Sequence, residues 1–81
     1  MSGASGRGCI IRATHRNTGR TVFGRAGKSH WLLEKEIPYV EEVKTRAEAE
    51  AQPFLDESFA EVQCGTMMRL YPEWCCVVIP L

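Results

Sequence analysis

The chain has 81 residues, of which 44% are hydrophobic and 25% are charged, a composition typical of one folded domain and not of a disordered or fibrous chain. Ten basic and ten acidic residues give a formal net charge of zero. A chain of this length has no room for a catalytic cleft between two lobes. It contains no run of 18 apolar residues and no apolar signal-peptide core, so we expect a cytoplasmic protein without membrane contact.

The charges are divided along the chain. Residues 1–30 carry six basic and no acidic side chains, which is a charge of +6. Residues 31–81 carry four basic and ten acidic side chains, which is a charge of −6. This asymmetry indicates either two opposite charged surfaces or two halves that neutralise each other.

The first elements form a predicted hairpin. Residues 1–8 are small and polar and are expected to form a flexible tail, which leaves 9–81 as a single domain. The apolar, β-branched residues of 9–16 predict a strand. Asn and Gly within 17–20 predict a turn, so 21–23 are expected to return as the second strand.

The middle of the chain is less regular. Gly24 and Gly27 are expected to begin a loop after the hairpin. Residues 30–36 fit either a short helix or a strand, and Pro38 argues against a helix that runs through this region. Residues 39–43 predict a third strand.

One main helix is predicted from a capping box, in which Thr45 and Glu48 satisfy each other's backbone groups. Pro53 lies inside this helix and indicates a kink, or a restart with Gln52 as its cap. Gly65 is expected to end the helix. Five apolar residues fall within about 80° of arc and predict its buried face: Ala47, Ala51, Phe54, Leu55 and Val62.

Two more strands are predicted after the helix. Residues 66–71 are expected to form one strand, and 74–79 a final strand. The consecutive apolar residues of 77–79 predict that the final strand is buried on both faces and lies in the centre of the sheet. The predicted fold class is therefore α+β, with the order β-β-(β)-α-β-β. A mainly antiparallel sheet of four or five strands carries the helix on one face.

Four cysteines and two histidines are enough to ligate zinc, but the close pairs of ligands that zinc sites use are missing. Without a secretion signal, we expect four reduced thiols, and we expect no metal and no cofactor. Two adjacent cysteines in the final strand should point to opposite faces of the sheet. The four are Cys9, Cys64, Cys75 and Cys76. A zinc-stabilised structural protein is the less favoured alternative.

A row of carboxylates on the predicted helix is the first candidate binding surface. Such a row can dock on a partner rich in Arg and Lys, and it can accelerate association electrostatically. An ordinary solvated helix face is the competing interpretation. The acidic residues are Glu48, Glu50, Asp56, Glu57 and Glu61.

The basic hairpin is the second candidate, as a nucleic-acid-binding surface. Cations in this half of the chain can contact phosphates, and Arg12 and Arg16 are spaced to share one face of the first strand. The nearby aromatic residues Phe23 and Trp31 are candidates for the core, which weakens this interpretation. The basic residues are Arg12, Arg16, Arg20, Arg25 and Lys28.

No set of residues in the sequence has the order and context of a catalytic site, so we expect a protein that is not an enzyme. The sequence favours a small module that binds a protein partner, of the inhibitor or adaptor type common in phages and mobile elements. The alternative is a nucleic-acid-binding module. An exposed edge of the hairpin can also pair with a second copy, which makes a homodimer an option.

Overall fold

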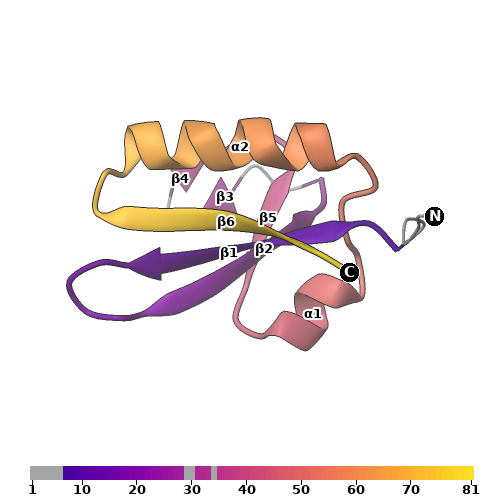
Figure 1. Ribbon diagram of the computed structural model, residues 1–81, viewed down its shortest axis with the longest axis horizontal. Helices are drawn as coiled ribbons and strands as arrows, with labels where there is room; N and C mark the ends of the chain where they lie inside the picture. Colours follow the sequence, from indigo (N-terminus) through magenta and orange to yellow (C-terminus); the bar gives the residue numbers. More distant parts are fainter. Residues whose placement is uncertain (1–6, 29–30, 34) are drawn as a thin grey trace.

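A computed structural model describes residues 7–28, 31–33 and 35–81 (Figure 1). The expected tail at 1–8 therefore falls largely outside the described residues. The described elements, in chain order, are β1 Cys9–His15, β2 Thr21–Ala26, β3 Trp31–Leu32, β4 Lys35–Glu36, β5 Val40–Val43, α1 Arg46–Glu50, α2 Glu57–Leu70 and β6 Trp74–Pro80.

Four strands form one antiparallel sheet in the order β5-β2-β1-β6, and β3 pairs with β4 in a small separate hairpin. The long helix α2 lies on one face of the sheet, while the short helix α1 lies on the other (Figure 1). The predicted α+β class with a mainly antiparallel sheet is confirmed. No described helix is long and apolar enough to cross a membrane.

The predicted β1–β2 hairpin is confirmed, with Arg12 opposite Phe23 and Gly19 at φ +76° in the turn. β1 ends at His15, so Arg16 belongs to the turn. The predicted strand at 9–16 is therefore one residue too long, and Arg16 lies just beyond its end. The hairpin also supplies the two inner strands of the sheet, so neither of its strands is an edge strand of the described sheet.

Gly24 does not begin a loop, because it lies within β2, opposite Ile11. A Cβ atom at this position would come within 3.0 Å of the Val40 side chain and 3.4 Å of the Ile11 side chain. The glycine therefore allows the side chains of neighbouring strands to close over the backbone of β2. The strand continues to Ala26, three residues further than predicted.

The ambiguous region contains the small β3–β4 hairpin instead of a helix. His30 lies outside the described residues. Trp31 is 53% exposed and is not part of the core. The third strand is confirmed as β5, which begins one residue after Tyr39, a residue with φ +64°.

The predicted main helix is two helices, so the alternative of a restart near Pro53 is right in kind, but the second cap is Asp56 and not Gln52. The capping box at Thr45 is confirmed, but α1 ends at Glu50. Phe54 then pairs with Cys9 through two backbone hydrogen bonds of 2.8 Å, so the connection that contains Pro53 follows the start of β1. Proline has no N–H for a helix, and a bridge to the sheet cannot form from helical backbone.

A second cap begins α2. The Asp56 carboxylate accepts hydrogen bonds from the backbone N–H groups of Ser58 and Phe59. The predicted strand at 66–71 is wrong, because α2 continues through it to Leu70. Burial of Met67 against the sheet outweighs the weak strand propensity of this segment. Pro72 follows the C-cap residue at position 71, where it prevents further helix.

The predicted buried face of the helix is also wrong, since it assumed one continuous helical period. Of its five residues only Phe54 is buried; Leu55 is 85% exposed. Because the helix is interrupted at 51–56, the side chains of α2 do not continue the helical spacing of α1. A different set of side chains therefore faces the sheet. The buried residues of the two helices are Ala49, Ala60, Gln63, Cys64 and Met67.

The final strand is an edge strand and not a central one. β6 pairs only with β1 among the described strands, and β1 supplies the most buried residues of the sheet. Cys76 is buried beneath α2, whereas Cys75 and Val77 are exposed on the opposite face. The prediction that the adjacent cysteines point to opposite faces is confirmed.

Cys64 and Cys76 form a disulfide that joins α2 to β6, with their Cα atoms 5.5 Å apart. The expectation of four thiols is therefore wrong for this pair, and Cys9 and Cys75 are free. The two partners are twelve residues apart in sequence and only the folded structure brings them together, because α2 turns back into β6.

The packing gives a direct test of the helix break. Phe54→Ala should lower the free energy of unfolding by about 3–5 kcal/mol, because it removes a buried ring. Leu55→Ala should change it by less than about 0.5 kcal/mol, because that side chain is exposed. Urea unfolding followed by circular dichroism measures both. Equal costs at the two positions would contradict the break.

Candidate interaction groove

The five candidate acidic residues do not form one row. Glu48 and Glu50 lie on α1, on one side of the sheet, whereas Asp56, Glu57 and Glu61 lie at or in α2 on the other side. The predicted row assumed a single helix, so the break that separates α1 from α2 also divides the acids into two groups.

The two acids of α1 have local structural partners. The Glu48 carboxylate accepts hydrogen bonds from the backbone N–H and the hydroxyl of Thr45, at 3.1 and 3.0 Å. These hydrogen bonds lower the pKa of Glu48 below its ordinary value, and the one from the Thr45 side chain has the largest effect. Glu50 forms an ion pair with Arg46, with 2.6 Å between the Nε atom and the carboxylate oxygen. Part of the acceptor capacity of each carboxylate is therefore already used within α1.

The acids of α2 are placed differently. Asp56 caps the helix, but no ion pair among the described residues involves Glu57 or Glu61. Both line a groove of about 350 Å³ between α2 and β6. This volume is within the range of about 300–1,000 Å³ that binding clefts have. The groove is lined by Glu57, Glu61, Cys64, Gly65, Met68, Cys76, Val77 and Val78.

Burial and the carboxylates of this region raise the pKa of the Cys9 thiol. Desolvation is the largest cause, followed by the negative charges of Glu57, Asp56 and Glu61. The three acids at the start of α2 therefore act together on the same part of β1. They give this end of the groove a negative potential.

The disulfide fixes the width of the groove, because it joins the helix to the strand from within its lining. Gly65 follows Cys64 on the helix, and a Cβ atom placed on it would meet nothing within 4 Å. The glycine thus leaves open space beside the disulfide. The predicted role of Gly65 as a helix stop is wrong, since it lies in the middle of α2.

The basic candidates are spread along the hairpin. Arg12 is exposed on the sheet face opposite α2, while Arg16 and Arg20 lie in the turn. Arg20 lies 5.9 Å from the ring centre of Trp74, a cation–π distance. Lys28 lies beyond the end of β2.

Arg25 has partners of its own. It pairs with Glu41 at 3.3 Å and donates to the backbone carbonyl of Glu48 at 3.0 Å. Among the described residues this is the one ion pair that joins the basic half of the chain to the acidic half. Ion pairs in the described structure therefore neutralise little of the charge of the two halves, and Glu57 and Glu61 remain available.

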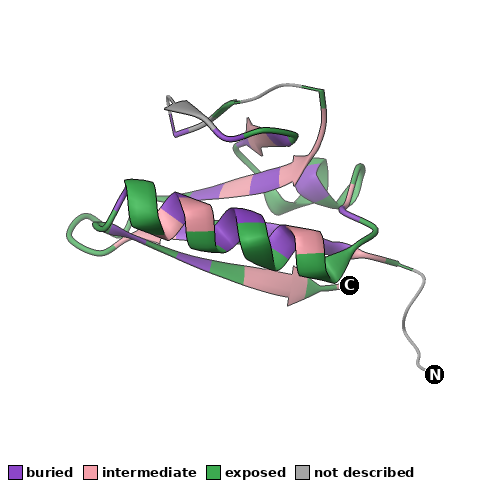
Figure 2. Ribbon diagram, turned by 90° about the horizontal axis from the view of Figure 1, so that it is seen from above, coloured by how far each residue is buried: buried purple, intermediate pink, exposed green. Residues whose placement is uncertain are grey.

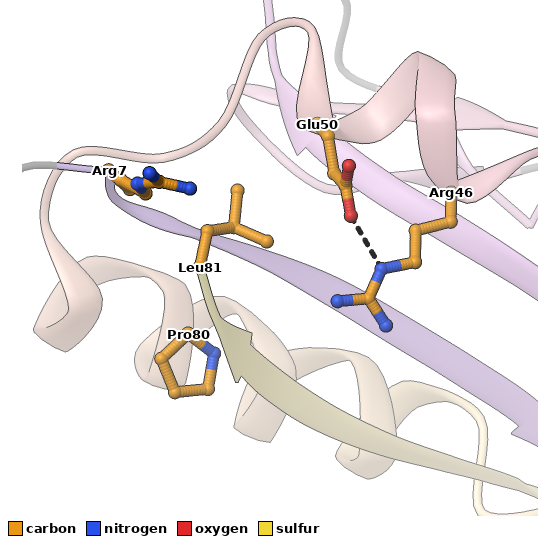
Figure 3. Close-up of a pocket in the computed structure, with 5 residues that line it drawn as sticks. All are labelled: Arg7, Arg46, Glu50, Pro80 and Leu81. Atoms are coloured by element: carbon orange, nitrogen blue, oxygen red, sulfur yellow. Dashed lines mark hydrogen bonds and ion pairs between the residues drawn. The ribbon is translucent and has the colours of Figure 1, made fainter. Parts of the chain in front are cut away.

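A second hollow, of about 490 Å³, lies near the end of β6. Figure 3 shows the Leu81 side chain between Arg7 and the ion pair of Arg46 with Glu50. Glu50 compensates the charge of Arg46, which leaves one cation, Arg7, beside an apolar floor. This arrangement is weaker support for an anion site than the α2–β6 groove is for a basic segment.

The sequence contains one local signal for the groove, which is the start of α2. Asp56 with Ser58 and Phe59 is an N-cap followed by a helical start, and it marks the true beginning of α2. The pairing of α2 with an edge strand has no local signal. In the described part of the chain no three His, Cys, Asp or Glu residues gather as a metal site would require.

The two free cysteines should differ in reactivity. Cys75 is exposed and should be alkylated rapidly by iodoacetamide at pH 8. Cys9 should react slowly, because it is buried and its raised pKa leaves less thiolate at any given pH. In the double variant E57Q/E61Q the pKa of Cys9 should fall. Mass spectrometry of labelling against pH measures this shift, and an unchanged profile would contradict the electrostatic link.

The groove thus combines an edge strand, a disulfide-braced helix and two carboxylates without an ion-pair partner among the described residues. Such a site can bind an extended, positively charged segment. No protein-family model, curated protein or solved structure matches the chain.

Proposed function

We propose that this protein is a small, non-enzymatic module that binds a basic segment of a protein partner in the groove between α2 and β6. The observation that supports it is the position of Glu57 and Glu61 on a groove that also has apolar lining. A module of this kind acts as an inhibitor or an adaptor by occupying its partner's segment.

The chemistry of the groove favours a peptide over a nucleic acid as ligand. Carboxylates repel phosphates and attract Lys and Arg, and the apolar lining at Met68 and Val78 can cover aliphatic side chains. The alternative nucleic-acid-binding module would use the hairpin instead. Arg25 is already paired there, and Arg12 stands on the face opposite α2.

Charge reversal tests the proposal. The probe is a seven-residue peptide of alternating lysine and valine, titrated by calorimetry at low salt. The double variant E57K/E61K should bind it at least about tenfold more weakly, which is ~1.4 kcal/mol, because like charges would then face each other. Glu73→Lys is the control. It changes the net charge by half as much as the double variant, at an exposed acid in the turn between α2 and β6, outside the groove lining.

Two results would contradict this function. Weakening by Glu73→Lys in proportion to its smaller change of charge would mean that only the net charge matters. Binding of a single-stranded thymidine 20-mer that falls steeply with salt and is lost in R12E/R16E would support the nucleic-acid alternative instead.

The cytoplasmic location predicted from the sequence conflicts with the Cys64–Cys76 disulfide that braces the groove, so the redox state of this pair tests that part of the proposal. Glutathione keeps thiols reduced in the cytoplasm, whereas an oxidising compartment preserves disulfides. In the cytoplasm both cysteines should be alkylated when native cells are quenched with acid and the denatured protein is labelled. A pair protected from labelling until a reductant is added would place the protein in an oxidising compartment.

A further inference from the structure

We propose that the partner's segment binds as an added β-strand, antiparallel to β6, with lysine or arginine side chains placed beside Glu57 and Glu61. This inference rests on the proposed function and specifies its geometry. β6 runs along α2 at the margin of the sheet, and its outer side is not covered by a described strand (Figure 2).

The hydrogen bonds at the two ends of β6 show which backbone groups are free. The Leu81 N–H donates to the Gly8 carbonyl, and the Glu73 carbonyl accepts from the Arg16 N–H. Because inward and outward groups alternate along an antiparallel strand, the odd-numbered residues of β6 bond to β1. The N–H and C=O groups of Cys76 and Val78 therefore point outward.

These two residues are the central part of the edge. The N–H of Trp74 already donates to the Tyr71 carbonyl at 3.0 Å, and proline at position 80 has no N–H to offer. An incoming antiparallel strand can thus form two complete hydrogen-bonded pairs, with Cys76 and with Val78. This pattern sets the register of the added strand.

The side chains of Cys76 and Val78 show on which face of the sheet the partner's side chains would lie. Cys76 is bonded to α2 through the disulfide and Val78 packs against the core cluster beneath α2, so both side chains are on the α2 side. Directly opposed residues of neighbouring strands share a face. The partner residues opposite Cys76 and Val78 therefore enter the groove, and the residue between them points away beside Val77.

The groove changes in character along β6. Because α2 and β6 run in opposite directions, each two-residue step along the strand corresponds to about four helical residues. Starting from the Cys64–Cys76 disulfide, Glu61 lies near Val78 and Glu57 lies near the end of the strand. Gly65 lies beside Cys76, and Met68 lies about one step closer to the start of β6; this part of the groove is apolar and open.

The expected partner pattern follows directly. Read from its N-terminus, an antiparallel segment presents a basic residue to Glu57, then after one residue a second basic residue to Glu61, and after one more an aliphatic residue beside Gly65. The sequence Lys-Val-Lys-Val-Leu satisfies all three positions. A second copy of the chain fits less well, because β6 contains no lysine or arginine to place beside Glu57 and Glu61.

The experiment uses the peptide acetyl-Lys-Val-Lys-Val-Leu-amide and the full chain. N-methylation of the second lysine, whose N–H would bond to Val78, should weaken binding about tenfold. N-methylation of the following valine, whose N–H points away from β6, should leave the affinity unchanged. The reversed sequence, Leu-Val-Lys-Val-Lys, should bind more weakly, because it exchanges the basic and aliphatic positions.

Hydrogen exchange provides a second measurement on the protein itself. The amides of Cys76 and Val78 should exchange rapidly in the free protein and become protected with peptide. The amide of Val77 should already be protected, because this residue bonds to Arg12 in β1.

Gly65→Trp should abolish binding by filling the groove, whereas Gly65→Ala should preserve it. A Cβ atom at this position meets open space, so the protein itself accommodates both substitutions.

The outcomes separate the two proposals. If E57K/E61K abolishes binding but the peptide N-methylated at the second lysine binds as well as the one N-methylated at the valine, the groove binds basic segments and the strand geometry is wrong. If the wild-type protein does not bind any lysine-containing peptide, both proposals are wrong. A free protein that sediments as a dimer with protected Cys76 and Val78 amides would overturn the inference, because the edge would then belong to a second copy.

Discussion

The pairing of Phe54 with Cys9 is the constraint on which the rest of the structure depends. Two backbone hydrogen bonds of 2.8 Å hold the connection between the helices against the first residue of β1. The chain approaches so closely here that Gly8 has φ +82° and a Cβ on it would collide with the Phe54 carbonyl oxygen. Because the connection crosses the end of the sheet at this point, α1 packs on one face and α2 on the other (Figure 1).

This crossing determines the distribution of charge. It places Glu48 and Glu50 on α1, where a cap and an ion pair use them, and it leaves Glu57 and Glu61 along the groove beside β6. The molecule is neutral in sum, yet the α2 side is acidic while Arg12 is exposed on the opposite face. Ion pairs between the basic and the acidic half neutralise little of their charge, because one described ion pair connects the two halves of the chain.

Local signals predicted the elements whose stability is local. The turn around Gly19, the two hairpin strands and the capping box at Thr45 depend on neighbours within a few residues, and all are present in the structure. The acids Glu57 and Glu61 were identified as candidates, but their groove was not. It requires a strand and a helix that meet only after the chain reverses at 71–73, and the disulfide of Cys64 with Cys76 depends on the same reversal.

The sequence by itself determined the α+β class, the hairpin and the first helix cap, because apolar patterning and turn chemistry act over short distances. Only the tertiary structure decided that 66–70 are helical, that β6 is an edge, and that the helix is broken before Asp56. In each case a contact with the sheet outweighed a local preference: Met67 of α2 against the sheet, β1 beside β6, and Phe54 against Cys9. Burial and backbone pairing across the fold are worth more than propensity, whose differences are fractions of a kilocalorie per residue.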